Sequence, residues 1–547
     1  MEDKTLTIKI ESILGGHSPM THFGRADQFR SSLGIDPGMP IDDSVSVLGG
    51  LPSGLLRPVA VSGSGTTVAA PMWLIGTPKV ATLIYVYDYA GSVYTVPSNS
   101  TTITGLTDLN DAGTATGNGA AYYDNYVYFA RDTTIARYGP LDGSAAFIDD
   151  YWVGTLGKTA LVNTTYPTDL QFSLKLPNHY LHRHSDGKLY IADVVDNKGT
   201  IHYIATSKAT VEGDTDNGST YNKVQVGYGL WPTCIESYGS DLAVAFTEIV
   251  VTANEVRATR AKVAFWDTTS QNVNKITWVE FPDEIITAMK NVNGVLYLTS
   301  GNQGSKGFRL SRFVGGYTFE QVAFISHAIS PFPGAIDGES NRLVFGAYSN
   351  VPETGGSIYS YGLGGLSVQG TFNILSARGY DGDNSITAQS CLISALKNLT
   401  SASVLGENNF IMGTSRGVAS SYHGIVLPSS FGSTGYDNAP SVFWSQLFRI
   451  GQPFKIKKIR IPLAQAIATN MIVTPKIYTD DGAGTTYTLT AINNTNDPGA
   501  FNAVRRSGSS GETMTGKHNF WLELRWTGSV LCVVGLPITI EYELIDD

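Results

Sequence analysis

The sequence predicts an all-β protein, built mainly as a β-propeller of about seven blades, with an extended N-terminal arm and a C-terminal β-sandwich or jelly roll. One strand-turn-strand pattern recurs along the chain. The strands are short, rich in Val, Ile, Thr and Tyr, and separated by many of the 59 glycines, as is typical of β proteins. Few windows show a period of 3.6 residues over three turns, so long helices are not expected.

The repeat is clearest at Asp186–Gly187, a tight-turn dipeptide followed by an apolar strand at Leu189–Ala192 and a second strand at Gly199–Ile204. Glycine adopts the positive φ of a hairpin turn without strain, and Asp tolerates it better than most residues. The six further copies are Thr82–Tyr87 with Gly91–Tyr94, Asn125–Phe129 with Thr134–Tyr138, Ser240–Phe246 with Lys262–Trp266, Asn293–Leu298 with Gly307–Leu310, Asn341–Phe345 with Gly356–Tyr361, and Glu407–Met412 with Tyr422–Val426.

Successive copies lie roughly 45 to 65 residues apart, the period of a four-stranded propeller blade with loop insertions. In three copies another strand precedes the turn, at Thr233–Tyr238, Ile286–Asn291 and Pro333–Asp337. Three such strands make most of a blade. The alternative interpretation is a set of unrelated hairpins in a sandwich or solenoid.

Three domains are expected: an arm over residues 1–60, the propeller over residues 61–435, and a sandwich over residues 436–547. Residues 5–11 alternate as a strand does, whereas the stretch from Gln28 favours one short helix closed by Gly34. The arm is too rich in Gly, Pro and Ser to form a core of its own. We therefore expect other chains, or the flank of the propeller, to order it.

The C-terminal block contains strands with one dry and one wet face. In Phe520–Trp526 and Ile538–Leu544 the even-numbered positions are apolar. In Phe454–Ile461 the alternation slips at Lys457–Lys458, which predicts a β-bulge. The four cations of that strand indicate either contact with an acidic partner or, as we favour, an exposed edge strand that lysines protect from pairing.

Composition limits the function classes. A net charge of −10 argues against a nucleic-acid-binding protein, although not against a local basic patch. The three cysteines, Cys234, Cys391 and Cys532, are far apart and read as ordinary core thiols. The N-terminus lacks the apolar run of a signal peptide, and no stretch of about 18 apolar residues predicts a membrane span.

Three places in the sequence contain residues of the types that bind metal ions. His182 and His184 share a strand face near His179 and could supply two zinc ligands, but no Cys, Asp or Glu at a fixed spacing completes the set. Asp214–Gly218 and Asp381–Asn384 have the composition of calcium loops without the distal Glu, and turns have the same composition. We assign no metal-binding residue and no cofactor.

Catalytic motifs are weak. The chain has neither a Gly-x-Ser-x-Gly elbow nor a phosphate-binding Gly-Lys-Ser/Thr loop. Ser185–Lys188 is a fragment of a sialidase box, Gly315–Gly316 and Gly364–Gly365 are non-periodic kelch-like doublets, and Trp266–Asp267 stands alone. No carboxylate pair can be selected by spacing. We therefore assign no catalytic residue and expect no enzymatic activity.

The chain resembles virion structural proteins of tailed bacteriophages, in which an N-terminal arm precedes a β-propeller and a small β-domain follows it. The segments that carry the resemblance, besides the repeats, are Gly15–Gly16, Phe23, Gln28–Phe29, Gly34–Pro37, Pro52–Pro58 and Gly535–Glu543.

The resemblance implies a tail-associated, nozzle-like or tail-tip-like component of the virion, made in the host cytoplasm, that contacts other tail or portal-proximal proteins and forms a homo-oligomer. It transfers no catalytic residue. The alternative is a propeller that binds or cleaves carbohydrate during host-surface recognition, because Tyr and Trp suit sugar stacking as well as β packing. Position along the tail, copy number, symmetry and partner identity do not follow from the sequence.

Overall fold

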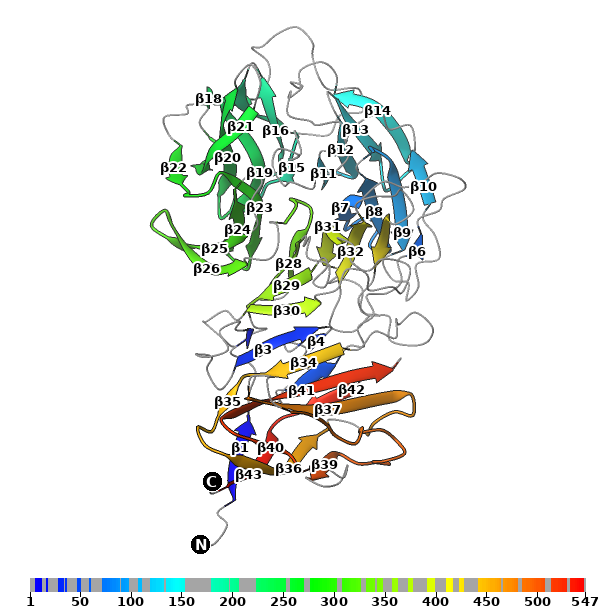
Figure 1. Cartoon of the computed structure of the whole chain (residues 1–547). Helices are drawn as coiled ribbons and strands as arrows, with labels where there is room; N and C mark the ends of the chain where they lie inside the picture. The colour runs from blue at the N-terminus through cyan, green and yellow to red at the C-terminus, as the bar shows by residue number, and fades with distance from the viewer. Residues whose placement is uncertain are drawn as a thin grey trace.

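The protein was analysed as a computed structural model, and every regular element among its described residues is a β-strand (Figure 1). No helix in this part of the chain is long and apolar enough to cross a membrane. The described residues are 5–11, 16–17, 28–33, 35–36, 47–50, 59–60, 71–88, 90–97, 107–110, 119–131, 134–152, 179–195, 197–205, 223–251, 256–269, 276–302, 307–325, 331–339, 342–347, 357–362, 372–376, 391–398, 410–416, 423–426, 441–463, 466–480, 485–506, 513–528 and 532–545.

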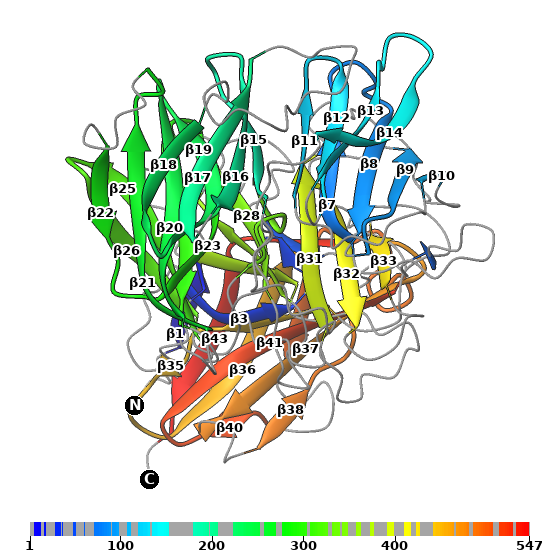
Figure 2. The same cartoon turned by 90° about the horizontal axis from the view of Figure 1, so that it is seen from above.

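Within these residues seven antiparallel sheets of four strands form a propeller, which confirms the predicted fold class (Figures 1 and 2). Blades 1 to 3 are β7 (Pro71–Gly76), β8 (Leu83–Asp88), β9 (Val93–Pro97) and β10 (Thr107–Asn110); β11 (Gly119–Tyr123), β12 (Tyr126–Ala130), β13 (Ile135–Gly139) and β14 (Ala146–Trp152); and β15 (Leu181–Arg183), β16 (Leu189–Val195), β17 (Lys198–Ile204) and β18 (Lys223–Tyr228).

Blades 4 to 6 follow the same order. They are β19 (Leu230–Tyr238), β20 (Asp241–Val251), β21 (Val256–Trp266) and β22 (Thr277–Glu280); β23 (Ile285–Val292), β24 (Val295–Gly301), β25 (Phe308–Gly315) and β26 (Thr318–Ile325); and β27 (Ile336–Glu339), β28 (Arg342–Ala347), β29 (Ser357–Tyr361) and β30 (Phe372–Ser376). The seven strand pairs expected from the sequence correspond to the two middle strands of each blade.

Blade 7 is closed by a strand from the other end of the chain. Its first three strands are β31 (Cys391–Asn398), β32 (Phe410–Arg416) and β33 (His423–Val426), and the fourth is β6 (Val59–Ala60). Gly424 faces Ala60 and Ile425 faces Val59 in this pairing. The innermost strands of neighbouring blades contact one another, including β31 with β7, so the propeller is a closed ring. The propeller therefore begins inside residues 1–60, the segment expected to be an arm ordered by other chains or by the propeller flank.

The second domain contains two packed sheets and a small third one. The first sheet is β1 (Leu6–Ile10), β43 (Ile538–Leu544), β36 (Phe454–Pro462), β39 (Asn502–Arg506) and β40 (Thr515–Gly516). The second is β2 (Gly16–His17), β3 (Gln28–Leu33), β34 (Ser441–Ser445), β35 (Phe448–Arg449), β41 (Asn519–Gly528), β37 (Met471–Thr479) and β38 (Thr486–Thr488). The third is β4 (Ile35–Asp36), β5 (Val47–Gly50) and β42 (Cys532–Gly535).

These pairings correct the expectation of a separate N-terminal arm. β1 runs antiparallel to β43, β3 pairs with β34, and β5 pairs with β42, so the described N-terminal strands are integrated into the C-terminal sandwich. The predicted short helix from Gln28 is the strand β3. Phe29 on β3 is fully buried and packs on Phe443, with ring centroids 5.8 Å apart. The segment has no core of its own because it shares the core of the C-terminal strands.

The sandwich core contains the even-numbered apolar residues that the alternation predicted, but the opposite face of β41 is not exposed to solvent, because Trp521 and Glu523 are buried as well. Phe520, Leu522, Leu524 and Trp526 are fully buried on one face of β41, and Ile538 and Ile540 of β43 belong to the same core. These even-numbered side chains account for much of the apolar surface that the domain removes from water.

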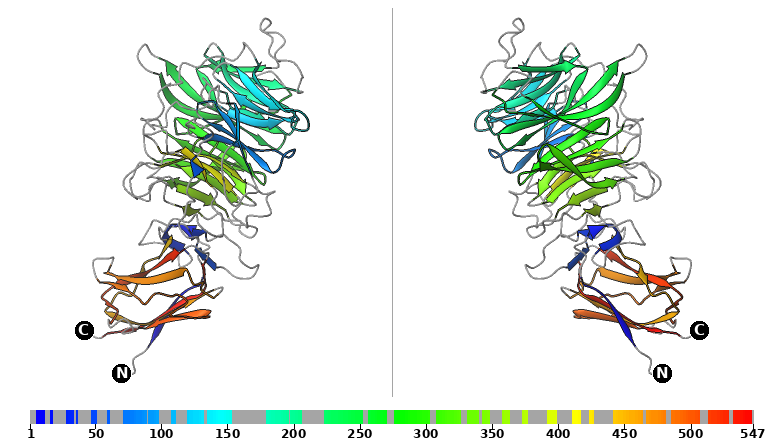
Figure 3. Two further views of the ribbon diagram at one scale, coloured as in Figure 1. Left: turned by 90° about the vertical axis from the view of Figure 1, so that its right-hand side faces the viewer. Right: turned by 90° about the vertical axis from the view of Figure 1, so that its left-hand side faces the viewer.

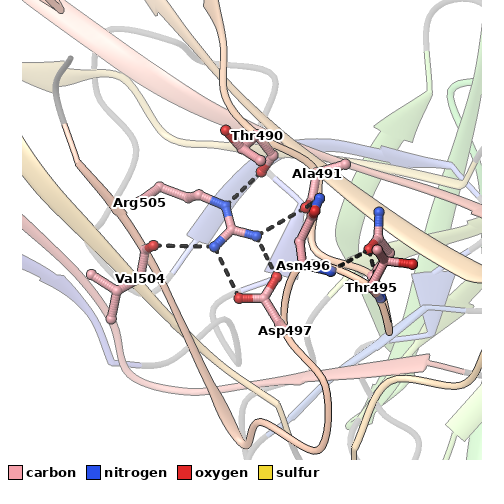
Figure 4. A network of polar contacts seen from close by, with 8 residues as sticks. Thr490, Ala491, Thr495, Asn496, Asp497, Val504 and Arg505 are labelled. Atoms are coloured by element: carbon pink, nitrogen blue, oxygen red, sulfur yellow. Dashed lines mark hydrogen bonds and ion pairs between the residues drawn. The ribbon is translucent and has the colours of Figure 1, made fainter. Parts of the chain in front are cut away.

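A buried arginine of β39, Arg505, binds the irregular segment that contains Thr490, Ala491 and Asp497 (Figure 4). Both Arg505 Nη atoms pair with the Asp497 carboxylate, at 3.0 Å for Nη1 and 2.5 Å for Nη2. Nη2 also donates to the carbonyl of Ala491, at 2.9 Å, and Nε donates to the carbonyl of Thr490. The planar guanidinium thereby satisfies a carboxylate and the backbone of an irregular segment together.

The two domains lie end to end (Figure 3). β30, the outer strand of blade 6, packs against β2, β3 and β4 of the sandwich. β1 and β43, the strands nearest the chain ends, lie on the side of the sandwich away from the propeller (Figures 1 and 3). The molecule therefore has two separate ends.

Candidate functional site in the propeller channel

Five ionisable side chains from five consecutive blades lie around the central channel. This set, called the channel ring below, consists of His182 on β15, Glu236 on β19, Lys290 on β23, Asp337 on β27 and Lys397 on β31. All five line one cavity of about 280 Å³, with blades 1 and 2 supplying mainly apolar and aromatic lining. The propeller thus gathers residues that are more than 200 positions apart in the sequence.

Three of the ring residues share a level because they occupy equivalent places on their innermost strands. Glu236 faces Ala243 of the next strand, Lys290 faces Tyr297, and Asp337 faces Val344, in each case the third pair from the hairpin turn. A repeated hairpin register places equivalent positions at equal depth when the blades close.

Asp337 makes ion pairs with both lysines of the channel ring. Its Oδ1 lies 3.0 Å from Lys290 Nζ, and its Oδ2 lies 3.0 Å from Lys397 Nζ. The backbone N–H of Asn398 also donates to Oδ2, at 2.9 Å. Burial alone would raise the pKa of Asp337, but the two ammonium groups and this hydrogen bond outweigh it and hold the pKa well below its usual range. In return, the Asp337 charge raises the pKa of Lys290.

The pKa of Glu236 is shifted in the opposite direction to that of Asp337. Its side chain is almost fully buried, and burial raises its pKa although Lys290 acts in the other direction. His182 Nε2 lies 3.9 Å from Glu236 Oε1, too far for a hydrogen bond. Burial, followed by the charge of Lys290, lowers the pKa of His182 to about 3, so this imidazole is neutral at physiological pH.

A serine links two of the histidines singled out in the sequence. His182 Nε2 and His184 Nδ1 each lie 2.8 Å from Ser237 Oγ, and His184 Nε2 lies 3.1 Å from the carbonyl of Ser240. A neutral His184 therefore carries its proton on Nε2 and accepts the Ser237 hydroxyl proton at Nδ1. The Ser237 oxygen is then left to accept an N–H from His182. The expected shared face of His182 and His184 is confirmed.

His179 lies elsewhere, inside blade 3. It is fully buried, with Nδ1 3.4 Å from Asp193 Oδ1, and His202 Nε2 lies 3.0 Å from Asp193 Oδ2. The Val194 N–H also donates to Asp193 Oδ1, at 2.7 Å. The three predicted histidines thus divide between a channel pair and a blade-core cluster. No group of three His, Cys, Asp or Glu side chains among the described residues could hold a metal ion.

The remaining sequence motifs have local roles where they are described. Asp186 accepts hydrogen bonds from the Tyr190 hydroxyl, at 2.7 Å, and from the Lys188 N–H, at 3.1 Å. Trp266 is buried in the blade core, and Cys234 and Cys532 are buried free thiols. The calcium-like stretches at 214–218 and 381–384, the doublet at 364–365 and the side chain of Cys391 lie outside the described residues.

The basic strand β36 requires a correction. The predicted bulge is present, because the register with β43 shifts between Ile456 and Lys458. However, β36 is no edge strand: β43 pairs with it on one side and β39 on the other. Its cations face acids of β43, with Lys457 2.6 Å from Glu543 and Lys458 3.1 Å from Glu541. The acidic partner is the neighbouring strand of the same domain.

Sequence reasoning missed Glu236, Lys290, Asp337 and Lys397 as a set. The strands carrying the first three were identified, yet no local spacing connects residues from different blades. The available signal was their common position, two or three residues before each hairpin turn. Aligning the repeats on their turns would have placed Glu236, Lys290 and Asp337 in one column.

Comparisons with known proteins provide little further information. Searches against protein-family models and curated sequences gave no match. Among solved structures, a protein from Lactobacillus plantarum is 15% identical over 63% of this chain and 96% of its own, with a TM-score of 0.36. The β-propeller domain of Cps50 (Swd1) from Myceliophteria thermophila is 9% identical over 65% of this chain and 96% of its own, with a TM-score of 0.38. We base no functional argument on these similarities.

Proposed function

We propose that this chain is a non-enzymatic structural component of a tailed-phage virion, located in the tail and acting through protein–protein contacts in an oligomeric assembly. The observation that carries the proposal is the two-ended architecture. One end is a sandwich made from both N-terminal and C-terminal strands, and the other is a closed propeller attached through the outer strand of blade 6. Such a molecule offers separate surfaces to two neighbours. The sequence resemblance described above is the reason for assigning those neighbours to a phage tail.

The charge pattern of the channel supports a structural role. Both oxygens of Asp337 are engaged by lysines from the two adjacent blades, so each ion pair ties one blade to the next. One carboxylate balances only one of the two ammonium charges, so the pairing holds both lysines in place without neutralising the ring. The channel ring therefore serves as a closure for the propeller.

Immunogold labelling of phage particles tests the proposal. Antibodies against the purified chain should detect it in gradient-purified particles by immunoblot and should place gold at the tail in negative-stain images. Particles assembled without this chain provide the control and should lose both signals. Absence of the chain from intact particles would overturn the proposal.

Glycan cleavage in the channel is a second candidate, favoured by one observation. Glu236 and Asp337 line the same cavity, and their surroundings move their pKa values apart, with Glu236 raised and Asp337 lowered. One carboxyl group with a raised pKa and one with a lowered pKa in the same cavity form the kind of pair that glycoside hydrolysis uses. We rank this function second because the oxygens of Asp337 already bind two lysines.

An assay for reducing ends released from bacterial surface polysaccharides distinguishes the two candidates. The structural proposal predicts no turnover above background by the wild-type chain. Steady turnover that Glu236→Gln abolishes, and that Glu320→Gln on the surface of blade 5 leaves unchanged, would instead establish the enzyme.

A further inference from the structure

A second cavity lies outside the channel, between blades 4 and 5, and has a volume of about 310 Å³. One side is Val279–Asp283, which begins in β22 and continues beyond it. The other side comes from β24, β25, the β25–β26 turn and β26. This volume is at the lower end of the range for small-molecule sites in proteins.

The polar side of this cavity is held by a chain of four side chains. Asp283 is only 1% exposed; the Ser300 hydroxyl donates to its Oδ2, at 2.6 Å, and the Arg309 guanidinium pairs with its Oδ1. Arg309 Nε in turn donates to Gln321 Oε1, at 3.1 Å. The Asp283 carbonyl accepts the Ala261 N–H, at 2.8 Å, which ties the cavity to blade 4. The cavity therefore presents fixed, planar hydrogen-bonding groups.

The charges around the cavity are balanced. Asp283 and Arg309 neutralise each other, and Glu280 pairs with Arg260, at 2.9 Å, and with Lys262, at 3.5 Å. A charged ligand would give up its hydration without gaining an uncommitted counter-charge, which disfavours its binding. The surroundings favour an uncharged ligand.

The apolar side is aromatic. Phe281 is buried, and its ring centroid lies 5.0 Å from that of Phe319. Tyr317, at the rim, is 52% exposed and meets Phe265 edge-on, at 5.7 Å. A partly exposed tyrosine ring provides a flat apolar face and a hydroxyl group at the entrance.

The backbone at Tyr317 is strained. Its φ is 56°, after Gly315 at 88° and Gly316 at 57°. Apart from Thr268, the other non-glycine residues with positive φ in the described part of the chain are Asp or Asn, which tolerate this conformation much better than a bulky aromatic. A turn of ordinary composition would carry Asn here. The tyrosine ring is therefore retained at a cost in stability.

From these features we propose that the cavity binds one neutral sugar unit of a glycan. A pyranose ring has C–H faces that pack on aromatic rings, and it has hydroxyl groups that both donate and accept hydrogen bonds. The Arg309 and Gln321 groups donate hydrogen bonds, the buried Asp283 carboxylate holds Arg309 in place, and the aromatic rings supply the apolar face. This site is separate from the channel, and the inference does not depend on the virion assignment.

Saturation-transfer NMR and titration calorimetry on the full chain test the site. The probes are D-glucose, D-galactose, D-mannose and N-acetyl-D-glucosamine, with D-glucuronate and D-glucosamine as charged analogues. We expect at least one neutral sugar to bind with a Kd of about 1 to 10 mM, and the charged analogues to bind about tenfold more weakly or not at all.

Tyr317→Asn is the decisive variant, because Asn suits the backbone at this position and the variant is expected to fold. It should weaken binding about tenfold or more, and Gln321→Ala should weaken it several-fold. Tyr228→Asn, which alters a 75% exposed tyrosine on blade 3, is the matched control and should bind as the wild type does. No binding of any neutral sugar at about 10 mM, equal binding of the charged analogues, or unchanged binding by Tyr317→Asn would overturn the inference.

Discussion

Asp337 is the residue on which the channel ring depends, because its single carboxylate pairs with two lysines. Replacing it with Asn keeps the shape and removes the charge, leaving Lys290 and Lys397 facing each other across the channel. Their side chains are 30% and 32% exposed, so water screens part of the loss. We expect Asp337→Asn to lower the free energy of unfolding by about 2–3 kcal/mol, below the range for a fully buried pair.

Urea denaturation measures this change. Glu320→Gln, which removes the exposed ion pair of Glu320 with Arg312, is the control and should cost about 0.5 kcal/mol or less. The pKa of Asp337 is lower in the folded state than the value of about 3.9 in the unfolded chain. Its charge therefore stabilises the fold fully above about pH 5 and progressively less as the pH falls below about 4. The difference between wild type and variant should narrow only in that acidic range.

His182 gives the fold a different pH dependence. Burial lowers its pKa from 6.5 to about 3, so between these values the unfolded chain binds a proton that the folded chain does not. The titration of His182 does not reduce the free energy of unfolding above pH 6.5. As the pH drops toward 3, the free energy of unfolding falls by up to about 1.4 kcal/mol per pH unit from this one group. His182→Gln can still donate to Ser237 but cannot be protonated. Unfolding free energies measured from pH 7 to pH 4 should fall less steeply for this variant, and equal slopes would show that His182 does not titrate as described.

At the residue scale, the sequence predicted those features that depend only on neighbouring residues in the chain, such as the direction in which a side chain leaves its strand. The alternation in β41 and β43, the bulge at Lys457–Lys458 and the shared face of His182 and His184 all follow from strand periodicity. The ion-pair partners of those residues could not be predicted from strand periodicity. Glu541 and Glu543 reach the lysines of β36, and Lys397 reaches Asp337, only through pairings between distant segments. No spacing along the chain records such contacts.

At the scale of elements, the middle strands of the blades were recognisable because a tight turn and an apolar run mark each pair. The two-residue strand β6 carries no such mark, although it completes blade 7. β3 was misassigned as a helix for a related reason: its only strong local signal was a glycine at its end, and its strand form comes from pairing with β34. Short strands whose partners lie far along the chain are the elements that local patterns identify least well.

Two N-terminal deletions separate the roles of these strands. Removing residues 1–11 takes away β1, an edge strand of one sheet, and should lower the melting temperature while leaving a folded protein. Removing residues 1–60 also takes away β3, β5 and β6, which opens blade 7 and strips the sandwich core of Phe29. We expect that chain to be insoluble or to lack cooperative unfolding in circular dichroism. A soluble chain that still unfolds cooperatively after removal of residues 1–60 would restore the idea of a dispensable arm.

At the scale of the whole molecule, the sandwich is discontinuous in sequence and the propeller is inserted between its parts. Strands from the first 50 residues pair with strands after residue 440 in all three of its sheets, as far as the chain is described. The domain boundary at residue 436 therefore marks only the second part of one folding unit. Composition changes along the chain revealed that boundary. They could not show that residues 1–50 fold together with the domain that follows the propeller in the sequence.

This organisation predicts which fragment folds. A chain that joins residues 1–50 to residues 438–547 through a short Gly/Ser linker contains every strand of the three sandwich sheets and should fold as an independent domain. Residues 438–547 alone lack β1 to β5, which removes Phe29 from Phe443 and leaves the edge of β34 that pairs with β3 without its partner. We expect the joined chain to give dispersed NMR amide signals and a cooperative thermal transition, and the shorter fragment to give neither. If the shorter fragment folded equally well, the N-terminal strands would be an addition to a complete sandwich, and the loss of structure expected on deleting residues 1–60 would have to come from the opening of blade 7.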